Sequence, residues 1–211
     1  MYEMVPCVDG SFFPESPMTM LAKGDYKKCP LIDGFNRDEG ASFVLYDREG
    51  NDPNSTTPPF VSKEWYERNA QYYLQYLPMT LNDLIVDSIN QEYVDWTKAD
   101  DPKADYFKSA ALLIGDSFFS CPGILETRAH ALAAEFDTYQ YFFTHVPSVS
   151  SFSIGEIGPK WYGAAHTEEI PFVFGWPFNP PQQLETYTYP DEEKALSLQM
   201  IKFWTNFAKT G

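Results

Sequence analysis

Residues 30–43 read Pro-Leu-Ile-Asp-Gly-Phe-Asn-Arg-Asp-Glu-Gly-Ala-Ser-Phe, an apolar run that breaks into a polar turn and then becomes apolar again. Residues 30–35 predict a short buried strand. Residues 36–40 predict a polar loop, and residues 41–46 form a short apolar stretch whose secondary structure the pattern leaves open. The sequence therefore places two adjacent carboxylates, Asp38 and Glu39, in a loop directly after a strand.

Further along the chain, four segments have the apolar spacing of helices: residues 63–76, 81–94, 101–114 and 124–133. Ser62 can cap the first of them, and Pro78 ends it. Residues 139–144 predict a second strand, rich in aromatic side chains and free of Gly and Pro. A long loop over 147–165 follows. Residues 190–207 predict a final helix, because a proline and three acidic residues stand in its first turn.

The predicted elements are two or three strands and about five helices, an unusual ratio for a self-sufficient α/β domain. A parallel sheet covered by helices has to be several strands wide. The 211 residues suffice for one large domain or two small ones. We therefore interpret the chain as α/β, and as the end of a larger sheet protein.

The charge of the chain argues against several kinds of partner. There are 15 Lys and Arg against 30 Asp and Glu, a formal net charge of −15, which disfavours nucleic acid and anionic membrane surfaces. No apolar run is long enough for a membrane helix, and the first ten residues do not have the pattern of a signal peptide. The three cysteines include no C-x-x-C pair and no Cys/His cluster, so we expect neither a metal site nor a cofactor.

Two segments resemble motifs of a known family. Residues 34–43 resemble the acidic-residue motif of the type-B carboxylesterase and cholinesterase family of α/β-hydrolases. Residues 161–175, Trp-Tyr-Gly-Ala-Ala-His-Thr-Glu-Glu-Ile-Pro-Phe-Val-Phe-Gly, resemble that family's catalytic-histidine motif. Three further segments agree with the family in the same order: residues 5–14, 115–122 and 203–211. The resemblance covers the whole chain but only the C-terminal portion of the family's domain.

The resemblance implies that residues 1–211 are the C-terminal part of a carboxylesterase type-B domain, with an α/β-hydrolase fold whose sheet is incomplete. In this family the nucleophilic serine, on its Gly-x-Ser-x-Gly turn, and the oxyanion-hole glycines lie upstream. No serine of this chain stands between two glycines at that spacing. We therefore expect the missing N-terminal part of the domain to be a partner, and the chain alone to be inactive.

An ester hydrolase of this class needs a serine, an acid and a histidine in that order. The histidine takes the proton of the serine, and the acid holds the imidazole in the correct tautomer. The family motif places the acid directly before the glycine, which selects Glu39 over Asp38, and it places the base at His166. His130, in a predicted helix, is expected at the surface, and His145, at the end of the second strand, is expected to be structural.

The resemblance also implies side chains around the catalytic pair. Phe43 matches an acyl-pocket aromatic residue, Tyr46 lies near the rim of the substrate gorge, and Glu169 is expected to support the pair indirectly. Small or polar residues stand where choline-binding relatives carry aromatic rings: Ser42, Gly158, Thr167 and Glu168. Aromatic rings bind quaternary ammonium groups by cation–π attraction, so their loss argues against acetylcholine as the substrate. Glu168 offers a carboxylate in their place.

The same resemblance bears on covalent modification and location. Cys121 matches a family half-cystine whose partner lies beyond Gly211. The number of cysteines also allows a disulfide between Cys7 and Cys29, but the family pattern does not support it. The sequon at Asn54 is a candidate glycosylation site. Because the family is largely secreted or membrane-anchored, we expect a secreted or extracellular membrane-associated protein.

The resulting hypothesis is a carboxylic ester hydrolase that acts on a small-molecule ester and contributes its acid and base from this chain. The sequence leaves open whether the protein forms a homo-oligomer. The alternative is a non-catalytic, neuroligin-like adhesion or binding protein, a class that uses the same scaffold and often lacks members of the triad. The presence of both Glu39 and His166 favours the enzyme.

Overall fold

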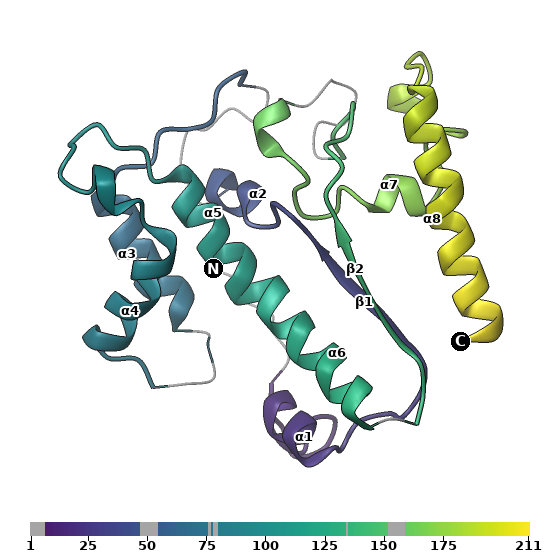
Figure 1. The fold of residues 1–211 in the computed structure, drawn as a ribbon, viewed down its shortest axis with the longest axis horizontal. Coiled ribbons are helices and arrows are strands. Elements are labelled where there is room, and N and C mark those ends of the chain that lie inside the picture. Colours follow the sequence, from purple (N-terminus) through teal and green to yellow (C-terminus); the bar gives the residue numbers. More distant parts are fainter. Residues whose placement is uncertain (1–6, 47–54, 76, 78–79, 134, 152–158) are drawn as a thin grey trace.

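A computed structural model describes residues 7–46, 55–75, 77, 80–133, 135–151 and 159–211 (Figure 1). At its centre lie two strands, β1 (Leu31–Asn36) and β2 (Thr138–Phe143). They are parallel, with Leu31 opposite Thr138 and Asn36 opposite Phe143. The two strands expected over 30–35 and 139–144 are thus confirmed to within one residue. Because the strands are parallel, their carboxyl ends meet at the same edge of the sheet.

Parallel strands need a crossover connection, and here it is long and mostly helical. The stretch that the sequence left open forms α2 (Ala41–Tyr46). α3 (Lys63–Leu74) begins after Ser62, whose Oγ accepts the N–H of Trp65 at 3.2 Å, as the capping pattern predicted. α4 (Asp83–Tyr93) begins two residues later than expected, because Asn82 caps it by accepting the N–H of Ile85 at 3.0 Å.

The third and fourth expected helices are parts of one continuous helical path (Figure 1). It consists of α5 (Phe107–Gly115), the π-helical turn η2 (Asp116–Ser120) and α6 (Cys121–Ala133). α5 begins later than residue 101 because Asp105 Oδ1 accepts the N–H groups of Val61 and Phe107, at 2.9 and 3.0 Å. Pro122 does not start a separate helix. Its ring crowds the preceding turn, and the wider π turn lies directly before it.

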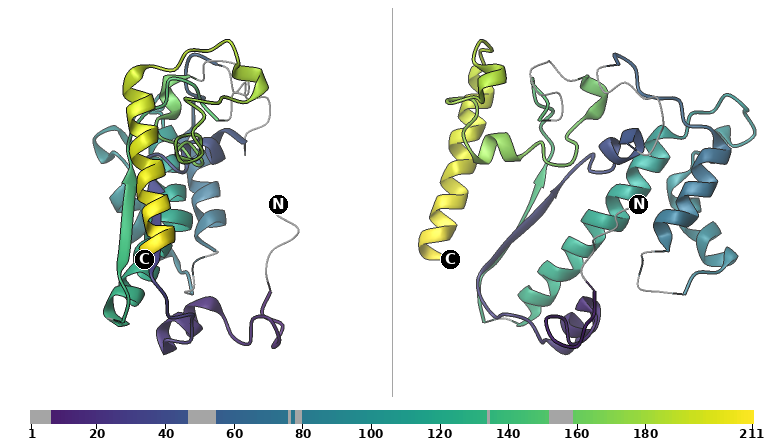
Figure 2. Two further views of the ribbon diagram at one scale, coloured as in Figure 1. Left: turned by 90° about the vertical axis from the view of Figure 1, so that its right-hand side faces the viewer. Right: turned by 180° about the vertical axis from the view of Figure 1, so that it is seen from behind.

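α8 (Asp191–Thr210) lies along one face of the two strands and meets β2 through aromatic rings, and α6 packs against the other face (Figures 1 and 2). Side chains of β2 alternate between these faces. The ring of Tyr141 lies 5.1 Å from that of Trp204 on α8, whereas Gln140 Nε2 donates to Thr127 Oγ1 of α6 at 2.7 Å. The final helix predicted over 190–207 is confirmed, with Pro190 directly before it.

The remaining elements are short: α1 (Pro17–Lys23), η1 (Trp96–Lys98), η3 (Lys160–Tyr162), α7 (Ile170–Val173) and η4 (Gln182–Leu184). The expected loop over 147–165 therefore contains one turn of 3₁₀ helix. Within the described ranges, no helix has both the length and the apolar character needed to cross a membrane.

Among the described residues, three buried clusters hold these elements together. The largest joins α2 to α3, α4 and α5 through residues such as Val44, Tyr66 and Leu113. A small cluster of Ala41, Leu45, Tyr162 and Ala165 joins α2 to the segment that precedes residue 166. The third lies at the end of β2, beneath α7 and α8. The helix α2, which follows the loop after β1, and the segment 162–165 are thus fixed by the same apolar packing.

Gly40 allows this packing, because its backbone lies directly against α5. A Cβ at Gly40 would meet the carbonyl oxygen of Ala111 at 2.0 Å and the nitrogen of Gly115 at 2.8 Å. We expect Gly40→Ala to lower the free energy of unfolding by about 3 kcal/mol, as overpacking against backbone does. Chemical denaturation measures this. Gly10→Ala is the control for an added methyl group without a clash, because its surroundings are open and its φ of 76° alone should cost about 1 kcal/mol. Equal losses in the two variants would contradict the explanation.

Candidate active site

Glu39 lies in the turn between β1 and α2, at the carboxyl edge of the sheet. Its side chain is 6% exposed, and its Oε1 accepts the backbone N–H of Asn36 at 2.7 Å. Arg37 pairs with the neighbouring Asp38 at 2.8 Å and leaves Glu39 to a different partner. A nearly buried carboxylate held by a backbone donor has a fixed direction, which a flexible surface glutamate would not have.

His166 is brought to this turn by backbone pairing between two distant loops. The N–H of Asp38 donates to the carbonyl of Ala164 at 2.9 Å, and the N–H of Ala164 donates to Asp38 Oδ2 at 2.8 Å. Gly163, with a φ of 69°, makes this approach possible, since a Cβ there would lie 2.0 Å from Asp38 Oδ2. The competing acid, Asp38, thus faces the backbone of the second loop.

The outcome is a direct contact between the two groups singled out in the sequence. Glu39 Oε2 lies 2.7 Å from Nδ1 of His166. The carboxylate is buried, whereas the imidazole side chain is 36% exposed. Because Nδ1 faces Glu39, the carboxylate favours the tautomer with a proton on Nδ1, and Nε2 is the nitrogen able to accept a further proton. This is a carboxylate–imidazole pair oriented for proton transfer at Nε2.

Asn36 links this pair to Glu169. Its Nδ2 donates to the carbonyl of Ala165 at 2.7 Å and to Glu169 Oε2 at 2.5 Å, while its N–H holds Glu39. Burial, and to a smaller extent the Glu169 carboxylate, raise the pKa of the nearby Tyr141 hydroxyl. The hydrogen bonds of Asn36 thus connect Glu169 to Glu39 and to the carbonyl of Ala165, the residue before His166. The sequence analysis did not select Asn36; its place three residues before Glu39 was the available signal.

Two phenylalanines flank the imidazole. The ring centroid of Phe43, on α2, lies 5.4 Å from that of His166, and Phe119 lies closer, at 4.5 Å with a 38° tilt. Phe119 belongs to the π turn η2, a kind of turn frequent at functional sites. The sequence analysis missed it because nothing in the pattern indicated a π turn. Tyr46, at the end of α2, is 64% exposed.

Glu168 lies in a place that the sequence did not suggest. It is fully buried, its Oε1 accepts the hydroxyl of Ser150, and its Oε2 accepts the N–H of Ser151 at 3.1 Å. Burial raises the pKa of the Glu168 carboxyl to about 7, despite the opposing effect of these two donors. A carboxylate enclosed in this way does not present an exposed charge to a cationic substrate, contrary to the expectation above.

The other two histidines have partners elsewhere. The ring of His130, expected at the surface, is half-buried 4.5 Å from that of Tyr26. His145 lies 2.9 Å from Glu193, which also accepts from Ser148. Burial alone would raise the pKa of Glu193, but the hydrogen bonds from His145 and Ser148 outweigh it and lower that pKa. A structural role for His145, which ties the end of β2 to α8, agrees with the expectation.

Several expected features stand outside this site. Cys7, Cys29 and Cys121 are all described, and none of them is in a disulfide within the chain. Asn54 and Gly158 lie outside the described residues. Among the residues that are described, no group of three or more His, Cys, Asp or Glu side chains could hold a metal ion.

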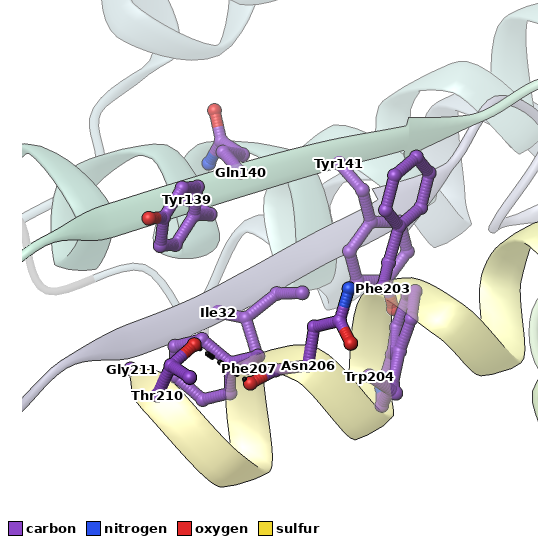
Figure 3. A pocket seen from close by; sticks show the side chains of 10 residues that line it. All are labelled: Ile32, Tyr139, Gln140, Tyr141, Phe203, Trp204, Asn206, Phe207, Thr210 and Gly211. Carbon is purple, nitrogen blue, oxygen red and sulfur yellow. Dashed lines mark hydrogen bonds between the residues drawn. The ribbon is translucent and has the colours of Figure 1, made fainter.

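A separate hollow of about 360 Å³ lies between α8 and the strands (Figure 3). Half of the residues that line it are aromatic: Ile32, Tyr139, Gln140, Tyr141, Phe203, Trp204, Asn206, Phe207, Thr210 and Gly211. Figure 3 also shows the hydrogen bond from Thr210 Oγ1 to the carbonyl of Asn206, at 3.0 Å. Neither Glu39 nor His166 borders this hollow, so it is distinct from the candidate active site.

Comparison with known proteins identifies the family. The carboxylesterase family model matches residues 1–211, and the chain therefore belongs to the carboxylesterase family. It is 29% identical over 210 residues to the acetylcholinesterase of Bungarus fasciatus. It is 32% identical over 216 and 218 residues to acetylcholinesterase 1 of Caenorhabditis elegans and of Caenorhabditis briggsae. Each match covers 100% of this chain but 32% of the relative, so the chain spans about a third of their length.

The family resemblance inferred from the motifs is thus confirmed. Membership implies the α/β-hydrolase fold, and a parallel pair of strands with a helix on each face is consistent with part of that fold.

The raised pKa of Glu168 predicts a pH dependence of stability. In the unfolded chain the carboxyl ionises near pH 4.5, and in the folded protein near pH 7. Between these values only the folded state holds the proton, so the free energy of unfolding falls as pH rises, by about 3 kcal/mol for this group. We expect Glu168→Gln to remove that decrease. Chemical denaturation of the parent and of Glu168→Gln from pH 4.5 to 8 measures the free energy of unfolding at each pH. The prediction would be contradicted if the free energies of the two proteins changed with pH in parallel.

Proposed function

We propose that this chain contributes the catalytic acid and base of a serine carboxylic ester hydrolase. The observation that supports it is the contact of 2.7 Å between Glu39 Oε2 and His166 Nδ1, in a chain that belongs to the carboxylesterase family. Glu39 is the acid and His166 the general base. Phe43 and Tyr46 contribute to the substrate pocket, and Glu169 supports the acid through Asn36.

The proposed chemistry follows from the contact of Nδ1 of His166 with Glu39, because that contact leaves Nε2 as the nitrogen that can accept a proton. Nε2 of His166 takes the proton of a serine hydroxyl as the serine oxygen attacks the ester carbonyl. The imidazolium keeps its Nδ1 proton toward Glu39, whose buried carboxylate stabilises the positive charge. The same proton on Nε2 passes to the departing alcohol and leaves an acyl-enzyme. Water then repeats the sequence, and the acid product and the free serine are released.

The nucleophile and the rest of the sheet are proposed to come from residues outside this chain. A parallel sheet of two strands is too narrow to be stable alone, and the described residues contain one such pair. The chain also spans about a third of the length of its relatives. On this proposal, residues 1–211 are the C-terminal part of a carboxylesterase type-B domain, and the preceding part is their partner.

The proposed substrate is a small carboxylic ester. The names of the relatives identify acetylcholine as the ester that those proteins hydrolyse. In this chain Ser42 and Glu168 are buried and are not aromatic, so they offer no ring surface for a quaternary ammonium group. We therefore propose an ester without a strict requirement for choline. An extracellular location, with glycosylation at Asn54 and a bridge from Cys121 to a cysteine beyond residue 211, belongs to the same proposal.

The isolated chain provides one test. Residues 1–211 contain no Gly-x-Ser-x-Gly turn, and without a nucleophile and an oxyanion hole almost all catalysis is lost. We expect the purified chain to hydrolyse p-nitrophenyl acetate no faster than its His166→Ala variant. The release of p-nitrophenol measures this. A clear excess over that variant would show a nucleophile within the chain itself and would contradict the proposal.

The complete protein provides the second test. Glu39→Gln keeps the shape of the side chain but removes the charge that stabilises the imidazolium, so we expect kcat to fall by about 10⁴-fold. Asp38→Asn is the matched control. Its amide oxygen can still accept the N–H of Ala164, and the expected loss is less than about tenfold. Steady-state kinetics on p-nitrophenyl esters distinguish the two acids, and the reverse order of losses would exclude Glu39.

A further inference from the structure

The residue after His166 has a strained backbone. Thr167 has a φ of 72° and is, in the part of the chain that the structure describes, the one residue other than glycine with a positive φ. The left-handed region is unfavourable for a β-branched side chain. Such a conformation persists only where surrounding contacts enforce it, and it occurs often at functional sites. The direction of the His166 side chain depends on this turn, because it begins immediately after the imidazole-bearing residue.

The contacts that enforce the turn come from the segment after β2. Glu168 accepts from the hydroxyl of Ser150 and from the N–H of Ser151, the latter at 3.1 Å. The hydroxyls of Thr167 and Ser151 lie 3.1 Å apart. Two successive residues after His166 are therefore joined to residues 150 and 151. Enclosing a carboxyl completely is unfavourable unless donors compensate, and both oxygens of Glu168 have a donor.

The histidine is thus held from two sides. Before it, Ala164 pairs with Asp38, and after it, Glu169 contacts Asn36 at 2.5 Å. These bonds join the loop to β1 and to the turn that carries Glu39. Glu168 and Thr167 join it to residues 150 and 151 of the segment that follows β2. Thr167 lies between the bonds to the Glu39 turn and the bonds to residues 150 and 151, so its backbone conformation depends on both.

We propose that Glu168 is a positioning residue for His166, which holds Thr167 in its left-handed conformation through Ser150 and Ser151 and so keeps the imidazole on Glu39. This inference rests on the proposed role of His166 as general base. It assigns no direct contact with substrate to Glu168. It also explains why a buried carboxyl stands at this position.

The bonds of Glu168 do not require its charge. When the carboxyl is protonated, its hydroxyl can donate to Ser150 Oγ while the other oxygen still accepts from Ser151. The groups that interact with it electrostatically are Glu169, which opposes its ionisation, and Tyr189, whose pKa it helps to raise. A glutamine can make the same two bonds as the protonated acid. We therefore expect the positioning to survive in Glu168→Gln and to be lost in Glu168→Ala.

The test is a double-mutant cycle in the complete protein, with p-nitrophenyl acetate as the substrate. We expect Glu168→Ala to lower kcat at least 30-fold with KM within about threefold, and Glu168→Gln to stay within about threefold of the parent. Thr167→Gly alone should change kcat little, because glycine adopts the left-handed region freely. In Glu168→Ala, however, Thr167→Gly should restore kcat at least fivefold, since the turn no longer needs to be enforced. Glu67→Ala, at an exposed helix position, is the matched control.

A role in overall stability alone would give a different result. Thermal unfolding of the same samples gives the folded fraction, and losses in kcat that only follow that fraction would overturn the proposal. Independent, multiplicative effects of Glu168→Ala and Thr167→Gly would also overturn it. If Glu168→Ala does not fold, Ser150→Ala removes one donor and should lower kcat about threefold to tenfold, again with partial recovery in the Thr167→Gly background.

His166→Ala in the same assay separates this inference from the proposed function. Full activity in His166→Ala would mean that the proposed function itself is wrong. An inactive His166→Ala together with a fully active Glu168→Ala would leave the function intact and reject the positioning role.

Discussion

The pairing of Asp38 with Ala164 is the constraint on which the candidate site depends. These two residues lie far apart in the chain, yet each donates its N–H to the other, at 2.9 and 2.8 Å. Glu39 is the next residue after Asp38, and His166 follows Ala164 by two, so the carboxylate and the imidazole meet once the loops are joined. Gly163 and Gly40 are required there because side chains would prevent the close approach of the backbones.

Around this pairing, three glutamates are packed into a small volume of low exposure. Glu39, Glu168 and Glu169 would repel one another, and each is expensive to remove from water. Hydrogen-bond donors compensate for this: the backbone N–H of Asn36 for Glu39, Nδ2 of Asn36 for Glu169, and Ser150 with Ser151 for Glu168. The imidazole of His166 is the partner of only one of them, Glu39. Different donor groups therefore hold the three neighbouring carboxyls in three different environments.

Helical packing completes the surroundings of the imidazole. α5 lies against Gly40, and the π turn that follows it directs Phe119 onto the ring of His166. The proline after this turn, Pro122, interrupts the regular helical hydrogen bonds and gives a local reason for the wider turn. The described part of the chain has one pair of strands among several helices, which is consistent with a chain that spans about a third of its relatives in the carboxylesterase family.

The sequence alone determined both strands, the cap at Ser62 and the final helix, because these depend on local patterns. A family motif selected Glu39 and His166, whose side chains are in contact in the structure. The sequence did not determine that α5 and α6 are one helical path, that Phe119 contacts His166, or that Glu168 is buried. Those features depend on contacts between residues distant in the chain, which periodicity does not encode. The tertiary structure decided them by bringing residues 36–40, 115–120, 150–151 and 164–169 to one edge of the sheet.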